Sequence, residues 1–352
     1  MKKNLFSAVK VIFFLGIGLL LIWLVVKDLN AEQRSQILQA FREANYWWLI
    51  PSAIVAFASH YSRAVRWNMM LRPMGYNPSA TNSFLAVMIG YLANLAVPRL
   101  GEITRCGILN RYEKVPIYKS VGTVVTERAI DLIILFLLFL FVFLAEFNRL
   151  GDYASREILV PLRGKLLSTA AQGPKLLLAA ALVLVTLSVL YLVRKKLKNL
   201  SIIKRIFGMI LGFAEGLKAI KNVERPFIFL FHSLFIWAGY LFMLYFCFFC
   251  LPETSSLGLG AAVSLLAFGS LAMIATPGGI GTYPIIMQMI LMRYLLPADP
   301  ATNSAADAEL LRLKAYAFGW IAWSGQTLMI IIVGLISLLI LPLINRQKDG
   351  QD

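Results

Sequence analysis

Long apolar stretches recur along the 352 residues, and they constrain the fold more than any other feature of the sequence. A helix needs about 20 mainly apolar residues to cross a bilayer, and it must satisfy its own backbone polar groups there. The sequence therefore predicts an all-α, polytopic membrane protein with about six full spans. The expected spans are residues 6–26, 46–66, 118–145, 174–193, 226–251 and 315–341.

Two further apolar regions are interrupted by proline and glycine, at residues 96–101 and 275–281. Proline removes a backbone donor and glycine weakens a helix, so we expect each region to break and form a re-entrant hairpin. The breaks fall at matching places in the two halves of the chain, which favours an inverted repeat. Eight full spans, with both broken segments crossing the membrane, are the alternative.

We expect one integral membrane domain over residues 1–352. It is divided into a first repeat half (1–146), a polar loop (147–173) and a second repeat half (174–344). In the basic stretch 194–225, apolar residues recur with helical spacing, which predicts an amphipathic helix on the membrane surface. Residues 297–312 are polar, and we expect them to form a loop.

The formal net charge of +16 supports an orientation in the membrane. With the N-terminus inside, the inner segments are residues 1–10, 62–131, 194–225 and 345–352. They carry 23 Lys and Arg against 8 Asp and Glu, and the rest of the chain carries 11 against 10. Positive residues concentrate in cytoplasmic loops, so both termini are expected in the cytoplasm of a bacterial cell, with the protein in its inner membrane. We expect anionic membrane lipids as partners and no nucleic acid, because no soluble segment is long enough to bind one.

Charged residues cluster around the first break, where membrane depth makes them expensive and therefore candidates for function. Arginine presents a planar fork that binds phosphate through two hydrogen bonds, so a lipid headgroup is the expected ligand. The alternative is that these residues form internal salt bridges and interface anchors. Five arginines and three carboxylates make up the cluster, and Asn94 could cap the break: Arg63, Arg66, Asn94, Arg99, Glu102, Arg105, Glu127, Arg128 and Asp131.

The second break has no charge, but its glycines expose backbone amides. A helix restarting near Tyr283 would direct its N-terminal amides toward an anion. The candidate residues are Pro277, Gly278, Gly279 and Gly281. Close helix packing or a simple kink is the alternative interpretation.

The sequence contains no nucleophile elbow, no zinc-protease motif and no nucleotide-binding loop. We expect no catalytic residue, no cofactor and no metal site, because the chain has only two histidines and three cysteines. An enzymatic role is thus the less favoured interpretation.

Four motifs together resemble the lysylphosphatidylglycerol synthase transmembrane-region family, also called flippase-like domain proteins. The resemblance implies a role in translocating lipids. We expect a stand-alone member without the soluble synthase domain, so aminoacyl transfer is not implied. The chain departs from the family at Pro284, where members often have a carboxylate. The motifs are Arg63, Arg66 and Trp67; Asn94, Pro98, Arg99, Gly101, Glu102 and Arg105; Glu127, Arg128 and Asp131; and Pro277, Gly278, Gly279, Ile280 and Gly281.

Three hypotheses follow for function. The leading one is a flippase-like transporter that moves an anionic phospholipid or lipid-linked phosphate across the cytoplasmic membrane. The second is an intramembrane enzyme that transfers a group to or from a lipid-linked phosphate, with Glu102, Glu127 and Asp131 as acid/base candidates. The third is an accessory subunit of an envelope-lipid pathway, with a separate lipid-modifying enzyme as its partner.

Overall fold

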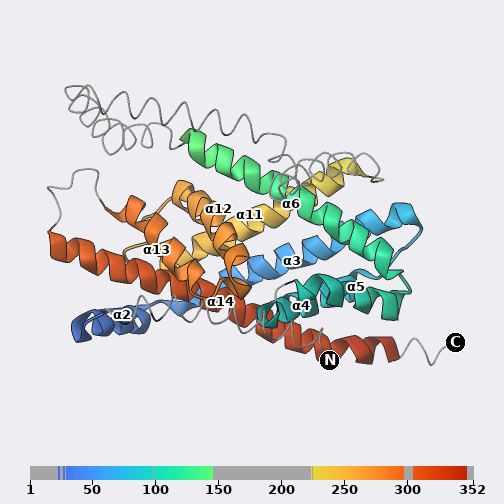
Figure 1. Cartoon of the computed structure of the whole chain (residues 1–352), viewed down its shortest axis with the longest axis horizontal. Coiled ribbons are helices and arrows are strands. Elements are labelled where there is room, and N and C mark those ends of the chain that lie inside the picture. Colours follow the sequence, from blue (N-terminus) through green and yellow to red (C-terminus); the bar gives the residue numbers. More distant parts are fainter. Residues whose placement is uncertain are drawn as a thin grey trace, which may run out of the picture.

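The computed structural model describes residues 23, 27, 29–97, 99–145, 223, 225–296 and 304–346, and in these residues every regular element is helical. This confirms the predicted all-α class. The helices form one elongated bundle (Figure 1). The expected spans 6–26 and 174–193, the polar loop 147–173 and the amphipathic helix 194–225 lie almost wholly outside the described residues.

The described helices contain two sets of four, and the first three helices of each set have matching lengths. The helices of the first set have 23, 17, 14 and 29 residues: α3 (Leu49–Leu71), α4 (Ala80–Ala96), α5 (Leu100–Glu113) and α6 (Ile117–Ala145). Those of the second have 22, 17, 14 and 42 residues: α11 (Pro226–Cys247), α12 (Leu259–Ala275), α13 (Thr282–Leu295) and α14 (Ala305–Arg346). Each set contains one short, broken hairpin, α4–α5 or α12–α13, at the same place.

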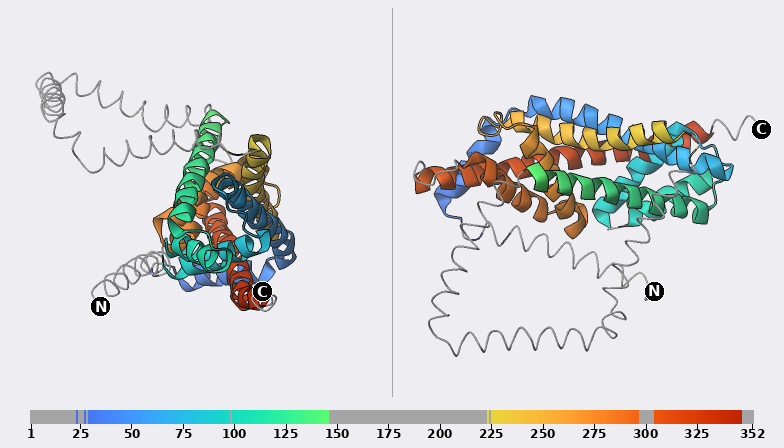
Figure 2. Two further views of the ribbon diagram at one scale, coloured as in Figure 1. Left: turned by 90° about the vertical axis from the view of Figure 1, so that its right-hand side faces the viewer. Right: turned by 90° about the horizontal axis from the view of Figure 1, so that it is seen from above.

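Helices α3 and α11, the first of each set, lie side by side and run antiparallel (Figure 2). The hydroxyl of Ser52 donates to the Met243 carbonyl at 2.8 Å, and that of Ser59 donates to the Ile236 carbonyl at 2.9 Å. A methyl group on Gly239 would lie 2.7 Å from the Ser59 Cβ, so only glycine permits this approach. Small residues and hydroxyls are the usual means of joining helices in membranes. The first helices of the two sets therefore run in opposite directions.

Three of the described helices are long and apolar enough to cross a membrane: Ile117–Ala145, Pro226–Cys250 and Ala305–Arg346. Many of their large apolar side chains are exposed, such as Phe136, Phe231 and Leu339, as expected of surfaces that face lipid. Helix α3 is equally long but carries Arg63 and Arg66 in its second half, which lowers its hydropathy. The short apolar helices Ala80–Leu95 and Leu259–Ile274 belong to the broken hairpins.

The structure corrects the loop expected at residues 297–312. Helix α14 already begins at Ala305, because the Ser304 side chain accepts a hydrogen bond from the Asp307 backbone N–H at 3.1 Å and caps the helix. Helix α2 (Ala31–Glu43) is an element that the apolar pattern did not predict. It starts at a capping box formed by Asn30 and Gln33, and Gln33 donates to Glu309 of α14 at 2.8 Å.

Candidate functional site

The first break separates α4 from α5 by three residues. Arg99 takes a left-handed conformation there, with φ of 66°, and turns the chain back. The Asn94 side chain spans the break by accepting a hydrogen bond from the Gly101 N–H at 2.7 Å. A methyl group at Gly101 would lie 2.0 Å from the Gly90 carbonyl oxygen, so the two helices touch through their backbones. These contacts fix the chain between α4 and α5 in a tight turn.

The second break reverses the chain through three glycines with positive φ. Gly278, Gly279 and Gly281 have φ of 58°, 76° and 76°, which L side chains rarely adopt. The hydroxyls of Thr276 and Thr282 lie 2.7 Å apart and bridge the two sides of the turn. The Pro-Gly pattern therefore predicted a real interruption, because its glycines are needed for the backbone path.

The two breaks meet inside the protein. A methyl group at Gly278 would lie 3.0 Å from the Leu95 Cδ2 of the first hairpin. The indole of Trp323, on α14, donates to the Gly278 carbonyl at 2.6 Å and fixes the second break against the long helix. Non-helical backbone of the second break therefore lies against the first hairpin. In inverted-repeat transporters, this is where substrate sites are built.

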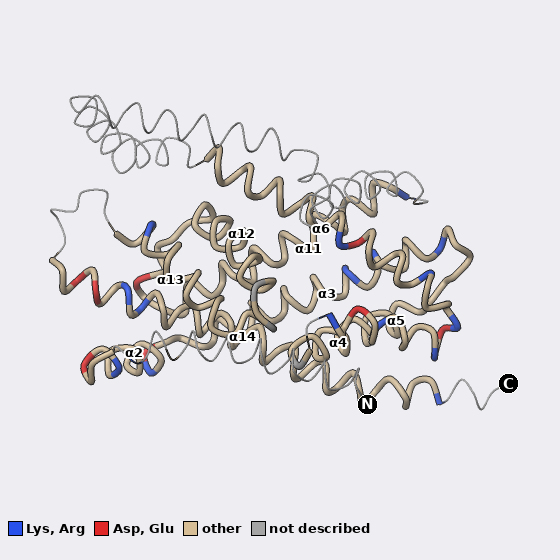
Figure 3. Tube along the Cα trace, viewed as in Figure 1, with Lys and Arg blue, Asp and Glu red and all other residues tan. Residues whose placement is uncertain are grey.

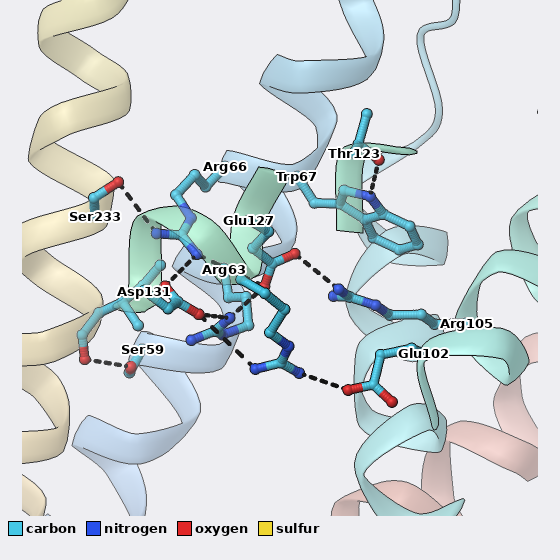
Figure 4. Close-up of polar contacts among 12 residues, drawn as sticks. Ser59, Arg63, Arg66, Trp67, Glu102, Arg105, Thr123, Glu127, Asp131 and Ser233 are labelled. Carbon is cyan, nitrogen blue, oxygen red and sulfur yellow. Dashed lines mark hydrogen bonds and ion pairs between the residues drawn. The ribbon is translucent and has the colours of Figure 1, made fainter. Parts of the chain in front are cut away.

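A buried ion cluster lies beside the first hairpin (Figure 4). Glu127 of α6 is fully buried and is contacted by three arginines from two other helices. Arg63 donates a short hydrogen bond to it, Arg66 lies 3.6 Å away, and Arg105 donates to it at 2.9 Å. The guanidinium of Arg105 also lies over the Trp67 ring, 4.6 Å from its centroid. Glu127 thus ties α6 to both α3 and α5.

Asp131, one turn further along α6, completes the cluster. Arg63 and Arg66 each donate to it at 2.8 Å, and Arg66 also donates to Ser233 of α11 at 3.2 Å. Three buried arginines therefore face two buried carboxylates, which leaves a local charge of +1. The Nε atoms of the three arginines, Arg63, Arg66 and Arg105, are buried and have no hydrogen-bond partner within the described chain. The cluster has both charge and donors to offer an anion.

Figure 3 shows where the charges lie along the bundle. They gather at both ends and in one interior group near α3, α4, α5 and α6, whereas the centre around α12 is uncharged.

The predicted site residues fall into four groups: a buried cluster, a half-exposed pair, Arg99 by itself, and the residues at the two breaks. Arg63, Arg66, Arg105, Glu127 and Asp131 come together in the buried cluster. Glu102 and Arg128 form a half-exposed pair at 3.1 Å, and Arg128 also lies 3.9 Å from Asp131 at the edge of the cluster.

Arg99 does not join the cluster expected from the sequence. It is exposed in the left-handed turn and makes no ion pair with another described residue, so four arginines and not five face the carboxylates. Asn94 and the glycines shape the breaks.

The sequence patterns did not predict a group of aromatic rings next to the cluster. His60, one turn before Arg63, is buried between the rings of Tyr91 and Tyr240, at 4.8 and 5.8 Å between centroids. Both of its ring nitrogens are buried without a hydrogen-bond partner in the described part of the protein. Its spacing of three from Arg63 puts both on one face of α3, which is the signal that could have found it.

The fold and the site together define an all-helical membrane protein with two broken hairpins and a buried arginine–carboxylate cluster. Residues 8–313 match the family model of the lysylphosphatidylglycerol synthase TM region, and the chain belongs to this family. It is 24% identical over 324 residues to a UPF0104 membrane protein of Methanocaldococcus jannaschii, a match that covers 90% of this chain and 91% of that relative. No solved structure matches the chain.

Proposed function

We propose that this protein is a flippase-like transporter that moves an anionic phospholipid or a lipid-linked phosphate across a membrane. The family is one of transmembrane regions, so this chain is a membrane protein. We infer the transport role from the site described above. The finer proposal is a bacterial inner-membrane location with both termini in the cytoplasm. Without the five arginines and three carboxylates around the first break, the inner segments still carry 18 basic and 5 acidic residues, which supports that orientation.

One observation carries the proposal: the two hairpin breaks face one another next to a buried cluster of charge +1. A broken backbone at membrane depth persists only where protein or a polar cavity satisfies it. An unbalanced positive charge at such depth is costly unless an anion joins it. A phosphate headgroup supplies that charge and accepts hydrogen bonds from the arginine Nε groups.

The mechanism that fits these contacts is rocking of one repeat against the other. Arg105 and Arg63 would hold the phosphate while the acyl chains stay in lipid. Glu127 joins α6 to α3 and α5 through charges, so an incoming anion would compete with it for the same guanidiniums. Competition of this kind would loosen α6 and expose the site to the other side.

The test is transport of fluorescent anionic phospholipids in vesicles reconstituted with the purified protein. We expect headgroup movement with the wild type, a large reduction with Arg105→Gln, and no change with the control Arg42→Ala on exposed α2. Variants are compared only if they elute as monodisperse, folded protein. Absence of movement for every anionic lipid tested with folded wild type would refute the proposal.

The intramembrane enzyme is less well supported. Both carboxylate oxygens of Glu127 are occupied by arginines, and so are both of Asp131. A carboxylate held in this way is stabilised as an anion, which opposes its use as a proton donor. A separate lipid-modifying enzyme as partner stays part of the proposal, to be tested by co-purification.

A further inference from the structure

An ion pair lies in the middle of the lipid-facing stripe of α6. Val121, Val125, Leu132 and Phe136 are exposed and recur with helical spacing, so they form one apolar face. Arg128 falls in the same stripe, and 43% of its side chain is exposed. Its partner Glu102, across on α5, is 27% exposed and sits beside the exposed Ile103.

Arg128 lies well inside α6 and not at its start. Lys119 is the charged residue nearest the start of α6, and Arg128 lies nine residues further along. At 1.5 Å per residue Arg128 lies about 13 Å further along the helix axis, between the exposed apolar residues Val125 and Leu132. A charge exposed to lipid there is expensive and is kept where it has a function.

One carboxylate oxygen of Glu102 has no donor among the described residues. Its Oε1 accepts from Arg128 at 3.1 Å, but its Oε2 is buried without a partner among the described residues. A buried carboxylate oxygen without a donor is costly, so a group that carries N–H or O–H fits this position. Arg128 meanwhile lies 3.9 Å from Asp131, which connects the surface pair to the buried cluster.

We propose that the seam between α5 and α6 at Glu102 and Arg128 is the lateral entrance for the lipid. The headgroup that it selects carries a hydrogen-bond donor, ammonium or hydroxyl, as well as a phosphate. This inference rests on the proposed transport function and names the substrate class of that site. The phosphate accepts a hydrogen bond from Arg128, and the ammonium or hydroxyl of the headgroup donates one to the Oε2 of Glu102. The acyl chains lie along the exposed apolar stripe of α6.

The experiment measures lipid binding to the full-length protein in nanodiscs, separately from transport. Two pairs of probes share their net charge and differ in the donor: phosphatidylglycerol against phosphatidylmethanol, and phosphatidylethanolamine against phosphatidylcholine. The member with the donor has the larger headgroup in the first pair and the smaller one in the second, so a preference in both pairs does not follow size. We expect the first member of each pair to bind about tenfold more tightly, since hydrogen bonds to charged groups are worth about that factor. Equal binding within both pairs would overturn the proposed headgroup class.

Variants assign the preference to the two residues. Glu102→Ala should abolish the preference within each pair, whereas Arg128→Ala should weaken both members equally. Glu102→Gln keeps an acceptor oxygen and should retain part of the preference, which guards against misfolding of the alanine variant. Glu32→Ala and Arg42→Ala, on the exposed face of α2, are the matched controls. An unchanged preference in both Glu102 variants would overturn the inference.

Two further arms separate this inference from the proposed function. Soluble glycerol phosphate should not displace the bound lipid, and displacement would mean that the seam binds free phosphates instead. Transport is measured on the same samples. If the protein prefers headgroups with a donor through Glu102 but shows no transport, the proposed transport function is wrong and the proposed lipid-binding site stands. Transport with no donor preference would refute the entrance and leave the transporter.

Discussion

Glu127 offers the sharpest test of the buried cluster. Replacing it with glutamine keeps the shape of the side chain but removes the charge that three arginines share. The buried charge then rises from +1 to +2, with Asp131 as the remaining anion among the described residues of the cluster. Breaking a buried ion pair by neutralising one partner costs about 3–5 kcal/mol, so Glu127→Gln should lower the free energy of unfolding by that amount.

The measurement is reversible unfolding in mixed micelles, with increasing fractions of a denaturing detergent. Glu309→Gln is the matched control, because it removes the same charge from the half-exposed pair with Arg312 at the polar start of α14, where the loss should stay below about 1 kcal/mol. Glu127→Asp keeps the charge, and its loss of free energy of unfolding should lie between those of the other two variants. If Glu127→Gln unfolds within about 1 kcal/mol of the wild type, charge does not hold α6 to α3 and α5.

The remaining predictions concern the two breaks. Gly101→Ala should prevent folding, because its methyl group would lie 2.0 Å from a backbone oxygen, whereas Gly107→Ala, with open space around it, should leave yield and thermal stability unchanged. Gly278→Ala should lower the free energy of unfolding by roughly 1–2 kcal/mol, the strain of a left-handed residue with a side chain. Trp323→Phe should lower it by about 1 kcal/mol through loss of the hydrogen bond to Gly278, and equal stability of variant and wild type would contradict that contact.

The sequence predicts much of this fold because lipid leaves the chain few choices. Apolar runs had to become helices, so α6 and α11 begin within a residue of the expected positions 118 and 226. Proline and glycine marked both breaks, since each removes or weakens helical hydrogen bonds. Helix α2 was missed because it is polar and short, and its signal is a capping box instead of an apolar stripe.

Contacts between helices were beyond reach of the sequence. The spacing of Glu127 and Asp131 puts them on one face of α6, which the structure repeats. Nothing in that spacing says which arginine they meet, because pairing across α3, α5 and α6 depends on how the helices pack. Arg99 illustrates the difference: its position in the chain suggested the cluster, but the left-handed turn carries it to the surface.

In the proposed transport path, the lipid headgroup passes the point where the second break meets the first hairpin. The most direct measurement is photo-crosslinking of a lipid that bears a reactive headgroup, followed by mapping of the modified residues. Cross-links at Leu95, Gly278 or Trp323, which lie together there, are the predicted result. Cross-links confined to exposed stripe residues such as Val125 and Phe136 would contradict the path and leave the protein with a lipid-contacting surface alone.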